Sequence, residues 1–150
     1  MPKYVLDSNL YIQATRENAF NDELEAFFWS AAPYIYLHSV VAGELVAGAF
    51  QPELERRTFE QFIEPHQDTG RVITPSHAAW LRAGQIIVKL VRAKRLGAKG
   101  VPRSFFNDCL IAASAREHGL TIITRNTADF DLIRTVEPVD AVPPWPEPRR

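Results

Sequence analysis

The sequence predicts an α/β protein whose central, mostly parallel sheet of about five strands is covered by helices on both faces. Three observations lead to this prediction. Short apolar, β-branched runs alternate with segments of helical periodicity along the whole chain. The strand-like runs are mostly apolar rather than alternating, which is typical of buried parallel strands. The chain has 150 residues, 46% of them apolar, which is enough for one domain with a substantial core.

Five short runs of aliphatic and β-branched residues are predicted to be the strands. They lie at residues 4–6, 34–38, 71–74, 121–124 and 136–139. The segments between them have helical spacing: a short helix follows Asp7, and Leu24, Phe27 and Phe28 predict a helix over residues 21–31. Further helices are predicted at residues 39–50, 53–64, about 76–94 and about 104–118. The last of these ends at Gly119, a residue suited to the position after a helix.

The end of the chain differs from the rest because it is rich in proline. Five prolines fall within the last 13 residues, and proline neither continues a helix nor donates a sheet hydrogen bond. We therefore assign residues 1–140 to one domain and residues 141–150 to a Pro-rich C-terminal tail. We expect Trp145 to anchor this tail against the domain.

The net charge of −1 hides an uneven distribution. Residues 1–68 carry 11 acids and 4 bases, whereas residues 69–107 carry no acid and 8 bases. Such a basic segment can attract a polyanion to an otherwise acidic protein. It can equally be a solvated helix face opposite an acidic partner or a neighbouring subunit, and the sequence leaves both interpretations open.

Several classes of protein find no support in the sequence. Cys109 is the single cysteine, so no internal disulfide or pair of cysteine ligands exists, and the four histidines show no zinc spacing. No Gly-rich phosphate loop and no Gly-x-Ser-x-Gly turn is present. The chain opens without a signal-peptide pattern, and its apolar runs are too short to span a membrane. We expect a cytoplasmic protein.

Four acidic residues carry the strongest functional signal: Asp7, Glu44, Asp108 and Asp129. Each lies in or beside an apolar element, where a carboxylate is costly to bury unless a cation meets it. Their wide distribution along the chain suggests that folding gathers them around one counter-charge. A divalent metal ion is the simplest candidate.

Each of these acids also has a simpler interpretation. Asp7 follows a strand, where parallel sheets bind ligands, but it can also cap the next helix. Glu44 lies in an apolar helix and points either into a polar cavity or at a basic partner. Asp108 lies near a helix N-terminus, which stabilises an anion, with Asn107 beside it as a cap or a second polar group. Asn126 and Asp129 together fit a capping box.

Four motifs in order resemble the PIN-domain family, most closely the VapC-type toxins of bacterial toxin–antitoxin pairs. The motifs are YVLDSN at 4–9, SVVAGEL at 39–45, NDCLIAASA at 107–115 and LTIITRNTADF at 120–130. The resemblance implies a three-layer α/β/α sandwich, with residues 1–140 as a PIN-like nuclease domain. It also implies a metal-dependent endoribonuclease that acts as a toxin on RNA, binds a small cognate antitoxin and forms a homodimer. Two apolar helix segments, at Phe27, Phe28 and Trp29 and at Trp80 and Leu81, are either such contact surfaces or part of the core.

The resemblance also implies roles for individual residues. Asp7, Glu44 and Asp108 match the three core acids of the family, and Asp7 and Asp108 are the expected ligands of Mg²⁺ or Mn²⁺. Ser8 matches a hydroxyl that lines the site. This chain departs from the strictest family pattern at the fourth acid, because Asn126 occupies a position that is acidic in some members. Asp129 is then the candidate fourth carboxylate, with Asn126 in a supporting role.

Two basic residues lie close in sequence to the predicted acids. Arg103 and Arg125 are expected either to bind the phosphates that flank the cleaved bond or to orient a site carboxylate through an ion pair. One alternative for the whole chain is a PIN-like domain that binds RNA or protein without cleavage. Another is a phosphatase of the haloacid dehalogenase type, but its second aspartate is missing because Asn9 occupies that position.

Overall fold

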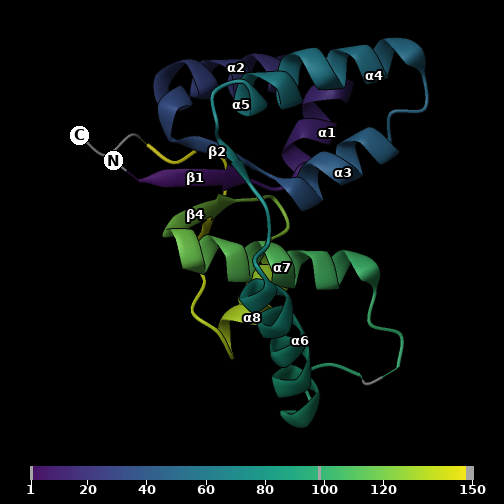
Figure 1. Ribbon diagram of the computed structural model, residues 1–150, viewed down its shortest axis with the longest axis vertical. Coiled ribbons are helices and arrows are strands. Elements are labelled where there is room, and N and C mark those ends of the chain that lie inside the picture. The colour runs from purple at the N-terminus through teal and green to yellow at the C-terminus, as the bar shows by residue number, and fades with distance from the viewer. Residues whose placement is uncertain (1, 98, 148–150) are drawn as a thin grey trace.

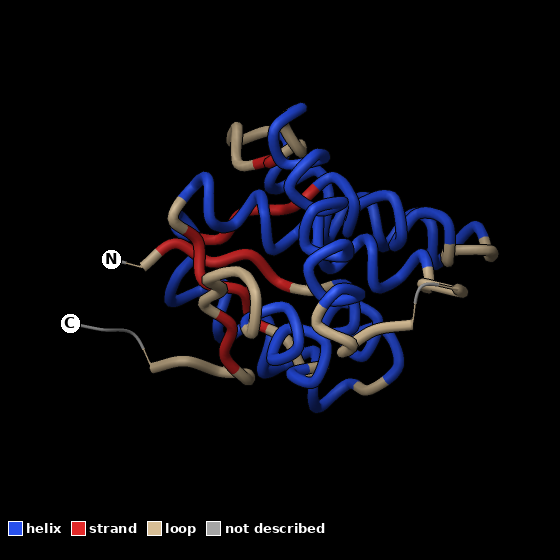
Figure 2. The backbone as a smooth tube through the Cα atoms, turned by 90° about the horizontal axis from the view of Figure 1, so that it is seen from below, coloured by secondary structure: helices blue, strands red, loops and turns tan. Residues whose placement is uncertain are grey.

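The computed structural model describes residues 2–97 and 99–147 and contains one five-stranded sheet in which every strand pairing is parallel. The strand order is β3-β2-β1-β4-β5. The strands are β1 (Lys3–Leu6), β2 (Ile35–His38), β3 (Val72–Ile73), β4 (Leu120–Ile123) and β5 (Ala141–Val142). Figure 2 shows them running side by side through the middle of the molecule, with helices around them.

Helices cover both faces of the sheet, as Figure 1 shows. On one face lie α1 (Ser8–Arg16), α2 (Asn18–Ala31), α3 (Ser39–Ala47), α4 (Pro52–Thr58) and α5 (Glu64–Gln67). On the other face lie α6 (His77–Arg92), α7 (Arg103–His118) and α8 (Thr127–Arg134). A 3₁₀ turn, η1 (Ala32–Tyr34), and a π turn, η2 (Phe59–Ile63), complete the helical segments. The predicted three-layer α/β/α sandwich is confirmed.

The predicted fifth strand at residues 136–139 is wrong. The N–H groups of Val136 and Glu137 both donate to the carbonyl of Ile133, so this segment continues the end of α8. Pro138 has no N–H to give to a sheet. The fifth strand is instead β5, whose Val142 accepts a hydrogen bond of 3.0 Å from the N–H of Thr124. The sheet therefore extends into the segment that the sequence assigns to the tail.

The predicted helix over residues 53–64 is divided in the structure and extends further along the chain. The π turn η2 separates α4 from α5 and brings Phe62 and Ile63 into the core, where they are 0% and 6% exposed. Pro65 follows this turn and has no N–H for the carbonyl of Gln61, so a regular α-helical bond is lost at this point. The sequence pattern gave no sign of the wider turn.

The strand order creates the position of a ligand site. From β1 the chain passes to β2 on one side, whereas β4 and β5 lie on the other side. In open parallel sheets this reversal leaves a crevice at the carboxyl ends of the two central strands, and ligands bind there. Asp7 directly follows β1 and Thr124 directly follows β4, and the Asp7 N–H donates to the Ile123 carbonyl at 2.9 Å. The two polar residues are thereby neighbours.

The C-terminal segment is attached to the domain by an aromatic cluster. Trp145 stacks on Phe20 and Phe27, with ring centroids 5.5 and 5.1 Å apart, so the predicted anchor is confirmed. Gly119 ends α7 with a φ of 65°, a left-handed conformation that favours glycine, as predicted. Among the residues that the structure describes, no helix is both long and apolar enough to cross a membrane.

Candidate functional site

Asp7 is buried at the carboxyl end of β1, and both of its carboxylate oxygens are fixed by hydrogen bonds. Oδ1 accepts from the N–H of Ser8 at 2.8 Å, and Oδ2 accepts from the hydroxyl of Thr124 at 2.9 Å and the amide of Asn9 at 3.4 Å. Burial raises the pKa of Asp7, as does the negative charge of Glu44, whereas hydrogen bonds from Thr124 and Ser8 lower it. Asp7 is also the N-cap of α1. It therefore both caps a helix and lies at the end of a strand, the two positions that the sequence left open as alternatives.

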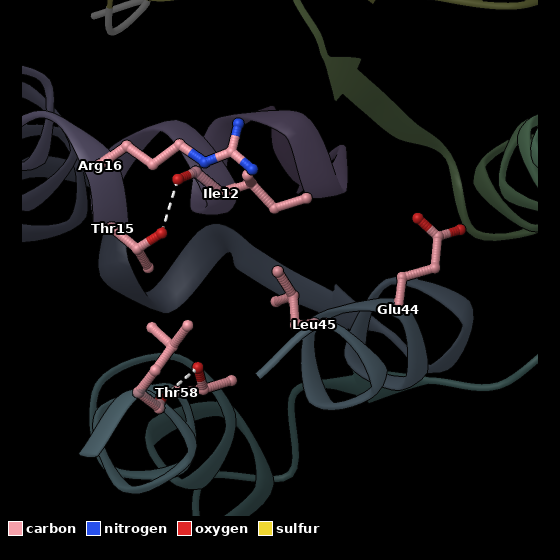
Figure 3. Close-up of a pocket in the computed structure, with 8 residues that line it drawn as sticks. Ile12, Thr15, Arg16, Glu44, Leu45 and Thr58 are labelled. Carbon is pink, nitrogen blue, oxygen red and sulfur yellow. Dashed lines mark hydrogen bonds between the residues drawn. The ribbon is translucent and has the colours of Figure 1, made fainter. Parts of the chain in front are cut away.

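Glu44 is held between two other helices. Its Oε2 accepts from the hydroxyl of Ser8 at 2.8 Å, and its Oε1 accepts from the amide of Asn107 at 3.0 Å. In the described part of the chain no lysine or arginine forms an ion pair with it, which favours the predicted polar cavity. Figure 3 shows the Glu44 carboxylate turned away from Leu45, on the side of β4.

The helix that carries Glu44 is less buried than its apolar sequence predicts. In α3 only Val41 and Leu45 are buried, whereas Gly43 and Ala47 are exposed. One side of α3 packs onto the domain, and the small side chains of its other side line a cavity shared with α6 and α7. Glu44 therefore lies at the border between the core and this open side.

Asp108 lies in the second turn of α7 and is 8% exposed. Its pKa is raised to about 9, chiefly by burial and next by the negative charge of Asp7. A contact with Asp129 and the charges of Asp129 and Glu44 are the smaller contributions to this rise. The four acids that were singled out from the sequence therefore face one another, although they come from four separate segments of the chain.

Asn126 and Asp129 interact with each other at the start of α8. The Asn126 amide donates to Oδ2 of Asp129 at 2.9 Å, and in the described structure its side chain caps no backbone group of the helix. Asn126 is exposed, whereas Asp129 is half-buried and reaches Asp108. The predicted capping box is thus replaced by a side-chain pair, and Asp129 is the member that contacts the other acids.

The groups that converge here fit a hard divalent cation. The converging groups are carboxylates, hydroxyls and side-chain amides, and their carboxylate and hydroxyl oxygens are the ligands that Mg²⁺ and Mn²⁺ prefer. The raised pKa values of Asp7 and Asp108 come first from burial and then from neighbouring acids, with no cation nearby in the described part of the chain to offset either. The Oδ1 atom of Asn9 is a buried acceptor that has no partner in the described structure. Among the described residues, no three acidic, histidine or cysteine side chains lie in an arrangement that already fits a metal ion.

Three residues of this network, Asn9, Thr124 and Asn107, received no definite site role from the sequence. Thr124 is fully buried, and its hydroxyl bonds Asp7 while accepting from the N–H of Asn126 at 3.0 Å. Asn107 bonds Glu44 and was considered only as a cap or a neighbouring polar group. The available signal for Thr124 was its place at the end of a predicted strand, directly before the Arg125–Asn126 pair.

The two predicted phosphate-binding arginines lie in different surroundings. Arg103 is the first residue of α7, is exposed, and lines the same cavity as Glu44 and Asn107. The guanidinium of Arg125 lies 4.8 Å from the ring centroid of Phe20. In the described part of the chain neither arginine forms an ion pair with a site acid, so the interpretation as a carboxylate-orienting residue finds no support.

Comparison with known proteins identifies relatives that cover most of the chain. The family model described as PIN domain matches residues 4–135. A tRNA(fMet)-specific endonuclease VapC of Shigella flexneri is 32% identical over 133 residues, which cover 89% of this chain and 93% of the relative. A ribonuclease VapC of Haemophilus influenzae is 29% identical over 136 residues, with the same coverage.

Two solved structures share this fold over nearly the whole chain. A DNA-bound VapBC from Salmonella typhimurium superposes with a TM-score of 0.71 at 23% identity. The FitAcB structure from Neisseria gonorrhoeae superposes with a TM-score of 0.69 at 25% identity. Each comparison covers 95% of this chain and 98% of the other.

Proposed function

This chain belongs to the PIN domain family, and on that premise we propose that it is a metal-dependent endoribonuclease of the VapC type, the toxin of a toxin–antitoxin pair. One observation supports the proposal more than any other. Asp7 and Asp108 are buried and face Glu44 and Asp129, and no cation of the described protein pairs with any of them. Such a cluster is costly for folding alone and is suited to binding a divalent ion and a phosphate.

In this proposal Asp7 and Asp108 hold Mg²⁺ or Mn²⁺, because they are the most deeply buried acids of the cluster. A bound divalent ion supplies Lewis-acid chemistry, which activates water as a nucleophile and offsets negative charge on the phosphate. Asp129 adds a fourth carboxylate at the open side, where the amide of Asn126 fixes its orientation.

The protein's own hydrogen bonds prepare this cluster. Thr124 and Ser8 donate to Asp7 and favour its ionised form, the form that binds a cation. Ser8 and Asn107 bond both oxygens of Glu44 and so fix the orientation of that carboxylate. These donors act as the supporting shell that metal sites need.

RNA is the proposed substrate, because one relative is a tRNA(fMet)-specific endonuclease and a second is a ribonuclease. Arg103 and Arg125 are the proposed contacts to the phosphates that flank the cleaved bond. A small antitoxin is the proposed protein partner, since the similar solved structures include VapBC complexes. We also propose a homodimer and a cytoplasmic location. Trp29, at 93% exposed beside half-buried Phe28, offers an apolar surface to a protein partner.

A second candidate is a PIN-like domain that binds RNA or protein without cutting. The neutral Asn126 and the lack of a closed metal shell among the described residues favour this alternative. Incubation of the purified chain with RNA, in Mg²⁺, in Mn²⁺ and in excess chelator, separates the two. The nuclease cleaves only in the presence of the divalent ion. Binding of RNA without cleavage under all three conditions would establish the alternative.

A further inference from the structure

A cavity of about 510 Å³ adjoins the acidic cluster and opens between α3, α6 and α7. Its volume is within the roughly 300–1,000 Å³ range of small-ligand sites. Glu44 and Asn107 belong to its wall and to the hydrogen-bond network of the acids, so the cavity is continuous with the site. On the α3 side its wall includes Gly43, where an added Cβ would meet nothing within 4 Å.

Trp80 supplies the aromatic part of the cavity wall. It lies in the first turn of α6, and its ring packs against Phe106 of α7, with centroids 6.0 Å apart and an interplanar angle of 35°. The remaining half of Trp80 is exposed. A large ring that is supported from behind and open in front is well suited to stacking on a flat ligand.

One cation lines the cavity. Arg103 lies in its wall, whereas the exposed Arg92, Lys94 and Arg95 lie in the last turn of α6 and the segment after it and do not line the cavity. In the part of the chain that the structure describes, none of these four forms an ion pair. Arg103 is the first residue of α7. The unpaired Arg103 therefore favours a ligand that carries an anionic group.

We infer that the cavity binds one unpaired base of single-stranded RNA beside the cleaved bond, with Trp80 stacking on the base and Arg103 contacting the neighbouring phosphate. The inference rests on the proposed ribonuclease function and names the part of the substrate that this cavity takes. A base has a flat face for Trp80 and polar edges for the hydroxyl and amide groups of Ser39, Ser104 and Asn107 in the wall. The negatively charged phosphate next to this base supplies an ion-pair partner for Arg103.

The test is the affinity of a short, fluorescently labelled single-stranded RNA, measured by anisotropy in the full-length chain with Asp7→Asn to prevent cleavage. Trp80→Ala is expected to weaken binding about 5- to 150-fold, the range for loss of one base–aromatic stack. Trp80→Phe keeps a ring and is expected to lose much less. Leu81→Ala is the matched control, because Leu81 is a 56% exposed apolar neighbour on α6 that does not line the cavity.

A second pair of variants changes the cavity without touching Trp80. Gly43→Leu places a side chain in the open space above α3 and is expected to weaken RNA binding by at least about tenfold, through loss of the stacked base. Gly43→Ala leaves most of the cavity open and is expected to bind as the parent does. Circular dichroism and thermal melting establish that both variants are folded.

Three results would overturn either the base site in the cavity or the nuclease function, and they distinguish one from the other. Unchanged RNA affinity in both Trp80→Ala and Gly43→Leu, with cleavage by the wild-type chain intact, would remove the base site and leave the nuclease. A wild-type chain that neither binds nor cleaves RNA would remove the nuclease itself. If Trp80→Ala and Leu81→Ala both dissociate a dimer and change RNA affinity equally, the cavity is a contact between copies and the inference is wrong.

Discussion

The hydroxyl of Thr124 donates a hydrogen bond of 2.9 Å to Oδ2 of Asp7, and so joins the two residues that directly follow β4 and β1. The same hydroxyl accepts from the N–H of Asn126 at 3.0 Å, which connects Asp7 to the start of α8. Thr124 is 0% exposed, so both bonds are shielded from water. One buried hydroxyl thereby orients an acid of the site and the segment that carries the fourth acid.

Replacement of Thr124 by valine tests this connection, because valine has nearly the same shape without the hydroxyl. Without this donor the ionised form of Asp7 is less favoured, so its pKa rises further and its affinity for a cation falls. We expect Mn²⁺ binding to weaken about tenfold, as for the loss of one hydrogen bond to a charged group. Calorimetric titration measures this. Thr121→Val is the control, since the Thr121 hydroxyl bonds the exposed Asp140 instead; an equal effect of both variants would contradict the assignment.

The stability of the metal-free protein is expected to fall as pH rises between about 4 and about 9. The pKa of Asp108 is about 9 in the folded protein, above the ordinary aspartate value of about 4. Because the folded protein binds this proton more tightly than the unfolded protein, the stabilisation is complete below the pKa of the unfolded state. It is lost as pH rises through the pKa of the folded state. The slope from this one group is at most about 1.4 kcal/mol per pH unit.

Asp108→Asn removes this titration and is the variant that isolates it. Its unfolding free energy, measured by denaturant titration in chelator, is expected to exceed that of the wild type at pH 8 and to approach it near pH 4. Mg²⁺ is expected to stabilise the wild type at pH 8 more than this variant. A difference in unfolding free energy between the wild type and Asp108→Asn that is the same at pH 4 and pH 8 would contradict the buried, uncompensated carboxyl.

The fourth acid is expected to contribute less than the first. Asp129 is half-buried and held by the amide of Asn126, so Asp129→Ala should reduce cleavage less than Asp7→Asn does. Asn126→Asp adds a carboxylate beside Asp129 and should tighten Mn²⁺ binding, because the charge around the cation becomes more negative. Calorimetry and cleavage rates measure both effects. An Asp129→Ala protein as inactive as Asp7→Asn would contradict this smaller contribution of the fourth acid.

A buried carboxylate outside the site is expected to stabilise the fold. Glu137 is 4% exposed and bonds the guanidinium groups of Arg82, at 2.7 Å, and Arg116, which joins α6 and α7 to the segment after α8. Glu137→Gln should lower the free energy of unfolding by about 1–2 kcal/mol. This is less than for a fully buried ion pair, because both arginines are partly in solvent. Asp131→Asn, in an exposed pair with Arg134, should cost at most about 0.5 kcal/mol.

The effect of Glu137→Gln should depend on pH. Burial raises the pKa of Glu137, but the hydrogen bonds from Arg82 and Arg116 outweigh it, and the net pKa is lowered. The stabilisation is therefore present above the ordinary glutamate value and is lost as pH falls through the lowered one. Unfolding at neutral pH and near pH 3 measures this; a difference between wild type and variant that grows towards low pH would contradict the ion pairs.

Much of the fold was predictable because local patterns agree with the final arrangement. The alternation of apolar runs with helical segments gave four of the strands, and Gly119 marked the end of α7. The predicted fifth strand was wrong because the β-branched pattern around Pro138 was assigned to the sheet. The N–H groups of Val136 and Glu137 instead donate to the carbonyl of Ile133 at the end of α8. The division between α4 and α5 depends on how Phe62 and Ile63 reach the core, which no local pattern contains.

The site was predictable in its acids but not in its hydroxyls and amides. A carboxylate in an apolar segment stands out in any sequence, whereas Thr124 at the end of a strand does not. Its contact with Asp7 arises from the parallel register that pairs Leu6 with Ile123, a relation between residues far apart in the chain. The partnership of Asn107 with Glu44 depends in the same way on how α3 meets α7.

The decisive measurement is RNA cleavage in Mg²⁺ and in chelator by four proteins: the wild type, Asp7→Asn, Asp108→Asn and the control Asp68→Asn. Asp68 is exposed and distant in sequence from every site acid. We predict cleavage by the wild type and Asp68→Asn in Mg²⁺ only, and a loss of at least about 10²-fold in both site variants, whose melting temperatures in chelator equal or exceed that of the wild type. Near-normal cleavage by folded Asp7→Asn, or undiminished wild-type cleavage in chelator, would contradict a nuclease built on these buried acids.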